Sequence, residues 1–349
     1  MTSSISSSDP RAPEAGAAWN AARLRRWVAT FAAVFGGGIV VLYATLILID
    51  PFDSGRFPSL GLRGVSDRNL RTSHVSRGRD PQFDSAIFGN STGQAIDPAI
   101  LSARTGLRFT QLTFTQAGPR EVLSVLGWFV AHHRSVGAVV LVADDLWCSG
   151  DAKMPQRYPF PGWLYGGDFE YLAHVLNWKS LDRVIWRLQL ALGRRKPNDQ
   201  VGFFGYFEQH FYYASPTIPP DLTPAEANAD FVWIDRLRQT LADFAPDGTL
   251  SQASLVVVAP PVYVDYLPPE GSRRAGRVAR CKAALAAVAA RTARGALVDR
   301  RIDTPDVRSE DNFFDRIHYR PPLARSIEDA IVATLAGDVP GRTHDALKQ

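Results

Sequence analysis

The sequence predicts an α/β domain with a parallel sheet covered by helices on both faces, preceded by an N-terminal transmembrane helix. Two observations support this prediction. Short apolar segments alternate with helical patterns after residue 84, and one long uncharged segment lies near the N-terminus. Strands that alternate with helices form parallel sheets with helices packed on their faces.

The uncharged segment covers residues 27–49, which read WVATFAAVFGGGIVVLYATLILI. At about 1.5 Å per residue it would span roughly 34 Å, enough to cross the hydrocarbon core of a bilayer. Three arginines lie within residues 23–26, and Asp50 follows the segment. By the positive-inside rule, residues 1–26 form a cytoplasmic tail and the rest of the chain lies outside the cytoplasm.

A buried core helix, a cleaved signal peptide and a dimerising helix are alternatives for this segment. A core helix would not be uniformly apolar over such a length, and a signal peptide would be shorter and end in a small-x-small cleavage site. Residues 36–38 are all glycine and would allow two helices to approach closely. Residues 1–22 are rich in Ser, Ala and Pro, and we expect them to be disordered.

The strand and helix pattern places an extracytoplasmic domain at residues 84–336, after a lead-in at 50–83 and before a C-terminal tail at 337–349. The predicted strands cover residues 85–88, 108–114, 138–143, 254–259 and 296–299, and the predicted helices cover 119–132, 229–244, 273–293 and 322–335. Residues 138–143 are fully apolar, as is typical of a central parallel strand.

Residues 149–227 interrupt this pattern with an insertion that is dense in aromatic residues, Gly and Pro. The insertion either forms a cap or wall over the functional site or forms an ordinary aromatic subcore. Its aromatic residues are Trp163, Tyr165, Phe169, Tyr171, Trp178, Trp186, Phe203, Phe204, Tyr206, Phe207, Phe211, Tyr212 and Tyr213.

The charge and cysteine content exclude some classes of protein. The formal net charge is +4, but no run of five Lys or Arg residues occurs, so we expect no nucleic-acid partner. Cys148 and Cys281 lie in no CxxC motif, and we expect two buried free thiols. An oxidising compartment would permit one bridge between them.

Candidate catalytic residues lie at the two ends of the predicted domain. Ser91 follows the first strand, within Gly-Asn-Ser-Thr-Gly, and carboxyl ends of parallel strands are where ligands bind. There its backbone N–H, at the start of the next helix, could bind an oxyanion. His318 precedes the last helix and could activate the Ser91 hydroxyl, while Asp315 could orient His318. Alternatively, Ser91 is only a helix N-cap and the Asp-x-x-His spacing is coincidental.

The sequence predicts no metal site and no cofactor. His74, His174 and His210 lack carboxylate or cysteine neighbours at the spacing of metal ligands, and His132 and His133 lie at a helix end. No phosphate-binding loop and no GxGxxG motif is present, which argues against a nucleotide cofactor.

With Ser91 after the first strand and Asp315-x-x-His318 before the last helix, residues 84–336 resemble the SGNH (GDSL-like) hydrolase superfamily. Residues 115–118 (Thr-Gln-Ala-Gly) resemble the block whose Gly donates a backbone N–H to the oxyanion hole, and residues 256–261 resemble a strand-then-proline segment of membrane-anchored members. The resemblance implies a flavodoxin-like, three-layer α/β/α fold. It also implies a Ser91, Asp315 and His318 triad, with the Ser91 and Gly118 amides as oxyanion donors.

Two features depart from that family. Asn90 stands where the family has the Asp of Gly-Asp-Ser, and the Gly-x-Asn-Asp block has no counterpart. Asp144 and Asp145 follow the third strand instead, so the Asn that completes the oxyanion hole is missing. An ionised Asp cannot donate this hydrogen bond, and losing one donor costs about 10² to 10³ in rate. We expect Asn90 or the insertion to supply a substitute; Asp144, Asp145 and Asn312 are further residues expected near the site.

The resemblance is strongest to envelope members of the alginate O-acetylation and teichoic acid D-alanine-transfer type. It implies serine-dependent acyl transfer or ester hydrolysis, mainly of O-acetyl groups, on an envelope or exported polysaccharide. The expected partners are the polysaccharide or an acylated small molecule, the cytoplasmic (inner) membrane and a membrane-bound acyl-donor protein, with the catalytic domain periplasmic. A lipase or general esterase is one alternative, and a non-catalytic envelope assembly factor is another.

Overall fold

All five predicted strands form, and they make one parallel sheet in the order β2-β1-β3-β4-β5. The computed structural model describes residues 14–58, 61–66, 69–199, 201–202, 220–243 and 252–337. The strands are β1 (Ser85–Gly89), β2 (Phe109–Thr113), β3 (Ala138–Val142), β4 (Ser254–Ala259) and β5 (Ala296–Asp299). The prediction of an α/β fold with a parallel sheet is therefore confirmed.

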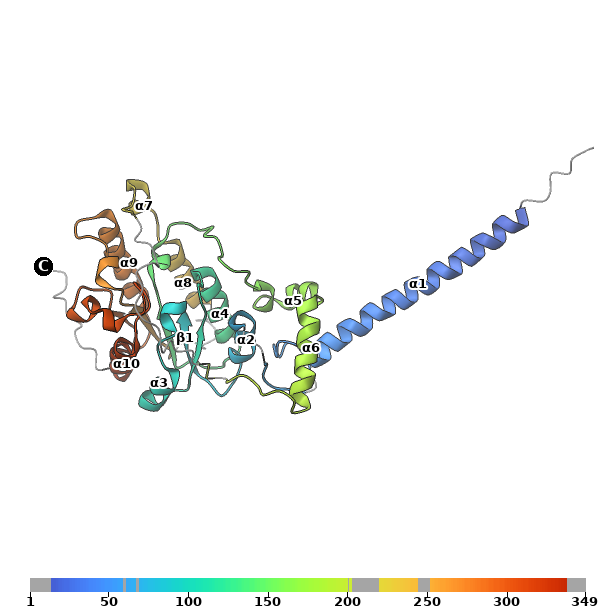
Figure 1. Cartoon of the computed structure of the whole chain (residues 1–349), viewed down its shortest axis with the longest axis horizontal. Coiled ribbons are helices and arrows are strands. Elements are labelled where there is room, and N and C mark those ends of the chain that lie inside the picture. The colour runs from blue at the N-terminus through green and yellow to red at the C-terminus, as the bar shows by residue number, and fades with distance from the viewer. Residues whose placement is uncertain are drawn as a thin grey trace, which may run out of the picture.

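Helices of the described residues pack on both faces of this sheet, and α1 projects away from it (Figure 1). Their bounds are α1 (Glu14–Ile49), α2 (Leu70–Arg77), α3 (Pro98–Thr105), α4 (Pro119–Ala131), α5 (Asp168–Val175), α6 (Trp178–Ala191), α7 (Pro224–Asn228), α8 (Val232–Asp243), α9 (Arg273–Ala289) and α10 (Pro321–Ala336). The predicted helices correspond to α4, α8, α9 and α10, with ends that differ by a few residues.

The sheet buries side chains on both of its faces. Phe88 of β1 and Leu141 of β3 belong to one hydrophobic cluster, which includes residues of α4, α8 and α9. The preceding residues Ile87 and Val140 belong to a second cluster, with residues of α3 and α10. Because successive strand side chains point to opposite faces, burial on both sides explains why β3 and β4 are apolar at nearly every position.

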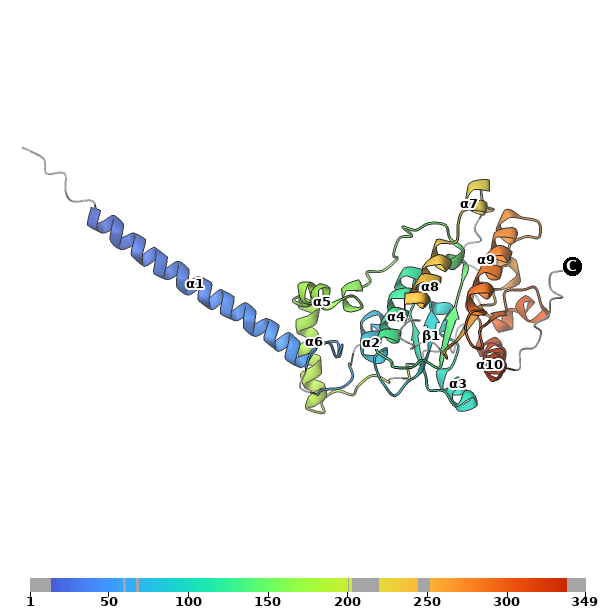
Figure 2. The ribbon, with the colours of Figure 1, turned by 180° about the vertical axis from the view of Figure 1, so that it is seen from behind.

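Helix α1 projects away from the rest of the protein (Figures 1 and 2). Within it, Asn20–Ile49 contains a window of mean hydropathy 2.4 that is only 11% buried, so the helix is long and apolar enough to cross a membrane. The expectation that residues 1–22 are disordered is wrong from Glu14 onward, while residues 1–13 lie outside the described part of the chain. The alanines of residues 14–22 favour helix, and a helix propagates readily once formed.

The lead-in at residues 50–83 is a folded part of the protein. The Asp53 carboxylate accepts hydrogen bonds from Ser76 Oγ at 2.7 Å and from the Gly64 backbone N–H at 2.7 Å. Helix α2 follows, and its Val75 side chain is fully buried. These buried contacts fix the path of the chain between α1 and β1.

The described part of the aromatic-rich insertion forms a subcore at the base of α1, which we name the anchor cluster. Its buried members are Leu46, Ile49, Phe52, Val75, Trp128, Leu164, Tyr171, Val175 and Val184. They come from the end of α1, from α2, α4, α5 and α6, and from the connecting segments. The predicted aromatic residues at 203–213, like the C-terminal tail after residue 337, lie outside the described residues.

Candidate active site

Ser91 lies immediately beyond the carboxyl end of β1. Gly89 has φ of 150°, and a Cβ there would lie 3.0 Å from the Val142 side chain, so glycine allows the chain to leave the sheet closely packed against β3. Asn90 Oδ1 then accepts hydrogen bonds from the Thr92 backbone N–H at 3.0 Å and from Thr92 Oγ1 at 2.8 Å. Ser91 therefore begins a single 3₁₀ turn, Ser91–Gly93, and not the α-helix that the sequence predicts.

The structure brings Ser91, His318 and Asp315 into one hydrogen-bonded chain. Ser91 Oγ lies 2.8 Å from His318 Nε2, across 227 residues of sequence, and His318 Nδ1 lies 2.7 Å from Asp315 Oδ2. A carboxylate only accepts, so the proton of the neutral imidazole is placed on Nδ1 and Nε2 is left to accept from the Ser91 hydroxyl. This is the geometry required of a serine nucleophile and its general base.

The Asp315 carboxylate is held by the loop that carries His318. Its Oδ1 accepts the backbone N–H groups of Ile317 and His318, each at 2.8 Å. Burial alone would raise the pKa of Asp315, but the hydrogen bonds from His318 and Ile317 outweigh it and lower the pKa below the usual value. The carboxylate is thus kept ionised beside the imidazole.

Two buried aromatic residues fix this loop on the protein. Phe313 and Tyr319 form an antiparallel bridge, and both pack into the same hydrophobic cluster as α10. The Phe314 backbone N–H donates to the His318 carbonyl at 2.8 Å, which closes the loop around Asp315. The His318 side chain is left partly open to solvent, with 22% of it exposed, while that of Asp315 is only 3% exposed.

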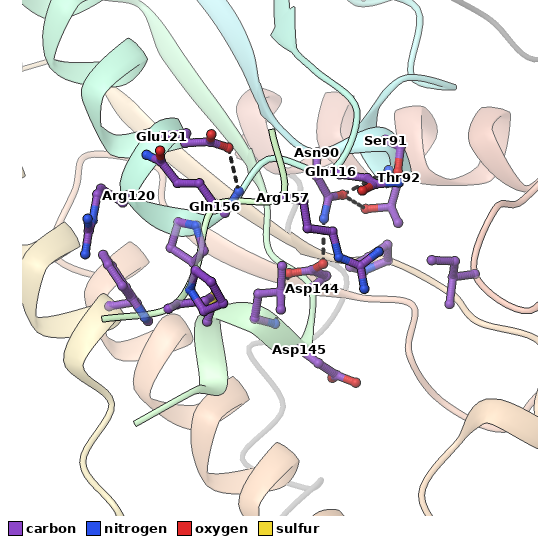
Figure 3. A pocket seen from close by; sticks show the side chains of 18 of the residues that line it. Asn90, Ser91, Thr92, Gln116, Arg120, Glu121, Asp144, Asp145, Gln156 and Arg157 are labelled. Carbon is purple, nitrogen blue, oxygen red and sulfur yellow. Dashed lines mark hydrogen bonds between the residues drawn. The ribbon is translucent and has the colours of Figure 1, made fainter. Parts of the chain in front are cut away.

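A cavity of about 380 Å³ opens beside Ser91 at the carboxyl end of the sheet (Figure 3). Its size is within the usual range of small-molecule sites. Its lining comes from the turn after β1, from the β2–α4 connection, from the segment after β3, from residues 154–157 of the insertion and from the segments after β4 and β5. The lining residues are Asn90, Ser91, Thr92, Gln116, Gly118, Pro119, Arg120, Glu121, Asp144, Asp145, Leu146, Met154, Pro155, Gln156, Arg157, Trp233, Pro260, Val262, Tyr266, Arg301 and Ile317.

Asp144 follows β3, the strand next to β1, and it is hydrogen-bonded to Asn90 of the turn that carries Ser91. Asn90 Nδ2 donates to Asp144 Oδ2 at 2.5 Å, and the Leu146 backbone N–H donates to Oδ1 at 3.0 Å. Burial, with the charge of Asp145 as a second cause, raises the pKa of Asp144 to about 6. Asp145 Oδ2 is paired with the buried Arg301 guanidinium at 2.6 Å.

Gly118 lines the cavity, but its backbone N–H is already hydrogen-bonded within the protein. It donates to Glu121 Oε2 at 3.0 Å, in a capping arrangement at the start of α4. Glu121 is buried, which raises its pKa, and Arg71 lies 3.8 Å from the same carboxylate. The oxyanion role that the resemblance implies for Gly118 therefore does not fit this arrangement.

The Ser91 backbone N–H has no hydrogen-bond partner among the described residues, so it is available to an oxyanion. A further candidate donor, not expected from the sequence, is the Gln116 side-chain amide, because Gln116 lines the cavity from the β2–α4 connection. Gln116 has φ of +54°, a left-handed conformation that costs about 1 kcal/mol or more outside glycine. One indirect signal was present in the sequence, because Gln116 lies inside the Thr-Gln-Ala-Gly block.

Of the other residues expected near the site, Asn90, Asp144 and Asp145 line the cavity and Asn312 does not. Asn312 Nδ2 donates to the Asp306 carbonyl at 2.9 Å, on the exposed 3₁₀ turn Glu310–Asn312. Asn312 is therefore not one of the residues that line the cavity.

The remaining histidines of the described residues make structural contacts. His74 is buried, its Nε2 lies 2.9 Å from the Thr113 carbonyl, and burial lowers its pKa well below the usual value. His133 Nδ1 lies 2.7 Å from the Phe129 carbonyl, and His174 Nδ1 lies 2.8 Å from the Glu170 carbonyl. Within the described chain no cluster of His, Cys, Asp and Glu could hold a metal ion, and His210 lies outside it.

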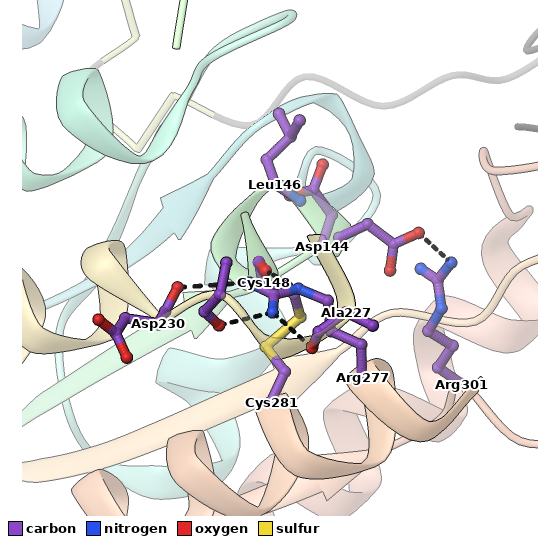
Figure 4. The surroundings of a disulfide bond; sticks show 10 residues. Asp144, Leu146, Cys148, Ala227, Asp230, Arg277, Cys281 and Arg301 are labelled. Atoms are coloured by element: carbon purple, nitrogen blue, oxygen red, sulfur yellow. Dashed lines mark hydrogen bonds and ion pairs between the residues drawn. A yellow bond between two sulfur atoms is a disulfide. The ribbon is translucent and has the colours of Figure 1, made fainter. Parts of the chain in front are cut away.

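Cys148 and Cys281 form a disulfide on the far side of the Asp144–Asp145 turn (Figure 4). The expectation of two free thiols is wrong, because the 3₁₀ turn Asp145–Cys148 packs directly on α9 and brings the two Cα atoms to 5.5 Å. Arg277 of α9 strengthens the junction, since its guanidinium donates to the Cys148 carbonyl at 2.8 Å and to the Ala229 carbonyl at 2.7 Å. The segment after β3 is thus fixed covalently beside the cavity.

Neither a scan against protein-family models nor a search of curated proteins finds a match for this chain. The chemistry of the site is therefore argued from its residues and their geometry.

Proposed function

We propose that this protein is a membrane-anchored, SGNH-type serine acyltransferase or esterase that acts on acyl esters, mainly O-acetyl esters, of an envelope or exported polysaccharide. One observation carries the proposal: Ser91 Oγ, the His318 ring and the Asp315 carboxylate are linked by hydrogen bonds of 2.8 and 2.7 Å. The strand order 2-1-3-4-5, with Ser91 after the first strand, fits a flavodoxin-like three-layer fold and supports the same assignment.

In the proposed reaction, Ser91 Oγ attacks the acyl carbonyl carbon while His318 Nε2 takes the hydroxyl proton. Asp315 holds Nδ1–H and stabilises the imidazolium that results. The tetrahedral intermediate collapses, the bond to the leaving oxygen breaks, and His318 returns the proton to that oxygen. The acyl group remains on Ser91 as an ester, and water or a sugar hydroxyl then attacks it by the same steps.

The oxyanion of the intermediate needs donors that are free in the resting protein. The Ser91 backbone N–H supplies one, and we propose the Gln116 side-chain amide as the second, in the role that Asn has in related sites. Asn90 is a weaker candidate because its amide already donates to Asp144 at 2.5 Å. The strained backbone of Gln116 is what a positioned donor would require, because strain is retained where function depends on it.

The proposed location is the cytoplasmic (inner) membrane, crossed once by α1, with the N-terminus inside and the catalytic domain periplasmic. The arginines at residues 23–26 support this orientation. The Cys148–Cys281 disulfide also supports it, because such bonds persist in oxidising compartments and are rare in the cytosol. An acyl-donor protein in the same membrane would be a suitable partner for a domain held at that surface.

A carbohydrate ester suits the cavity because its lining combines aromatic and polar side chains. Tyr266 supplies an aromatic ring, and Gln156 and Arg157 supply hydrogen-bond donors. A sugar ring presents hydroxyl groups at its edge and C–H groups on its faces, so both kinds of contact are useful. A lipase would need a longer apolar channel for its acyl chain.

A non-catalytic assembly factor is the second candidate, and one observation favours it. The Gly118 N–H is occupied by Glu121, and Asp144 follows β3 where an Asn donor is expected. In that case the cavity would bind a polysaccharide or its ester without turning it over.

The test is ester turnover by the full chain in detergent micelles, with nitrophenyl acetate, a nitrophenyl ester of a long fatty acid and an O-acetylated polysaccharide. We expect the acetyl esters to be turned over and Ser91→Ala to abolish the reaction. Ser73→Ala is the matched control, because Ser73 is buried in α2 away from the cavity. A preference for the long ester would favour the lipase alternative, and binding without turnover would favour the assembly factor.

A further inference from the structure

Helix α6 presents an apolar stripe to solvent. Trp178 is 81% exposed, Ile185 55%, Leu188 42% and Leu192, the residue after the helix, 67%. At 3.6 residues per turn these four side chains fall within about 80° of arc, so they form one continuous face. A contiguous exposed apolar surface of this kind marks an interaction site.

The opposite side of α6 is firmly attached to the protein, so the exposed stripe does not result from a poorly packed helix. Val184 belongs to the anchor cluster, and the Arg187 side chain is 1% exposed. The Arg187 guanidinium donates to the backbone carbonyls of Leu62 and Gly64, in the lead-in. The apolar stripe therefore points outward from a fixed helix.

The position of α6 along α1 sets its depth relative to a membrane. The helix lies across the domain end of α1 in both views (Figures 1 and 2), and the two share the anchor cluster through Leu46 and Ile49. Those residues lie about 28 to 33 Å along the helix from Trp27, where the uncharged segment begins. A hydrocarbon core is about 30 Å thick, which places α6 at its outer boundary.

The charged side chains beside the stripe complement a phospholipid surface. Arg194 and Lys196, just after α6, are exposed. Helices that lie in the membrane interface combine an apolar face with Lys and Arg beside it, and Trp is enriched at that level. Trp178 and these cations fit that pattern.

We propose that α6 is an interfacial helix, whose stripe of Trp178, Ile185, Leu188 and Leu192 inserts into the outer leaflet of the membrane that α1 crosses. The occupant of the stripe is the phospholipid bilayer. This inference depends on the proposed membrane crossing by α1. With α1 and α6 both inserted into the membrane, the domain cannot turn freely about α1. The cavity beside Ser91 is therefore held at a fixed height above the membrane.

The test uses the full chain in phospholipid nanodiscs that contain anionic lipid, with an environment-sensitive fluorophore on a single added cysteine. The two native cysteines are paired and do not react. Ile185→Cys reports on the stripe, and Lys179→Cys is the matched control on another face of the same helix. Lipids carrying a spin label near the headgroup end of the acyl chain should quench the Ile185 label at least about twofold more than the Lys179 label.

Two further results separate the possible failures. Val40→Cys, on the exposed surface of α1, should be quenched by lipids labelled near the middle of the bilayer. If the Val40 label is quenched but the Ile185 and Lys179 labels are quenched equally, the interfacial helix is refuted and the anchor stands. If the Val40 label is not quenched, the anchor itself fails. If the Ile185 label is shielded from water only in native membranes, the stripe binds a protein and the lipid proposal is wrong.

Discussion

The site around Ser91 and the anchor cluster are both buried, but different interactions stabilise them. The site consists of polar side chains from distant segments joined by hydrogen bonds, as between Ser91 and His318 and between Asn90 and Asp144. The anchor cluster consists of apolar and aromatic side chains such as Leu46 and Tyr171 that pack against one another. A substitution of Ser91 or His318 should therefore change the chemistry and leave stability nearly intact, and a substitution in the cluster should do the reverse.

The largest effect expected is on turnover, from His318→Ala. Removing the general base should lower kcat/KM for an acetyl ester by at least about 10³-fold. The imidazole is partly exposed, so the thermal unfolding midpoint should change little. His174→Ala, on an exposed surface of α5, is the control and should retain full turnover. A His318→Ala protein that retains turnover would show that the site does not act through a base at this position.

The opposite pattern is expected from Tyr171→Ala in the anchor cluster. Tyr171 is 1% exposed, and removing a buried aromatic ring costs about 3 to 5 kcal/mol of unfolding free energy. Turnover per folded molecule should be unchanged at a temperature where the variant remains folded. Phe169→Ala, on the same helix but 86% exposed, should leave stability unchanged. If Tyr171→Ala loses turnover with little loss of stability, the proposed difference between the site and the anchor cluster is wrong.

Gln116 tests the second oxyanion donor. Gln116→Ala and Gln116→Gly both remove the amide, and each should lower kcat by about 10²-fold. The glycine variant also relieves the left-handed backbone, so its stability should stay within about 1 kcal/mol of wild type. Thr115→Ala changes the exposed neighbouring side chain and should have no effect on kcat. If all three variants have the kcat of the wild type, the second oxyanion donor is a group other than Gln116.

The smallest effect expected is the pH dependence of Asp144→Asn. Asp144 is neutral below about pH 6 and ionised above it, when its charge opposes a nearby oxyanion. The ratio of kcat/KM between the variant and wild type should be near one at pH 5 and rise to about tenfold above pH 7. Taking a ratio cancels any titration that both proteins share. A ratio that is flat with pH would show that Asp144 does not act on the oxyanion.

Asp144→Asn should also change how the unfolding free energy depends on pH. The pKa of Asp144 is 3.8 in the unfolded chain and about 6 in the folded protein. As pH rises through this interval the unfolded state loses its proton first, so wild type loses up to about 3 kcal/mol of unfolding free energy. Asp144→Asn should therefore gain unfolding midpoint relative to wild type above pH 6 and lose that advantage below pH 4.

The fold and the three residues of the Ser91 site could be predicted from sequence because each depends on local pattern and strand order. The apolar runs that became β3 and β4 identify central strands, and a rule about the ends of parallel strands then selects Ser91. His318 follows because it precedes the last helix, which packs on the same sheet. The contact between Ser91 and His318 could therefore be predicted without knowing the conformation of the loops that carry them.

What could not be predicted depends on side-chain placement between distant segments. The occupation of the Gly118 N–H by Glu121 requires the rotamer of a buried carboxylate. The Cys148–Cys281 bridge joins residues 133 apart and depends on how closely a 3₁₀ turn packs on α9. The role of α5 and α6 in the anchor cluster depends on their contact with α1, which no periodicity within the insertion indicates.

The most direct test of the central claim is the reaction of Ser91 with a fluorophosphonate, which labels a serine hydroxyl only when a base activates it. The full chain should be treated in detergent micelles, digested, and the modified peptide mapped by mass spectrometry. The account predicts one adduct, on Ser91, that is absent from Ser91→Ala and strongly reduced in His318→Ala. An unmodified Ser91 in a folded protein, or an adduct on another serine, would contradict it.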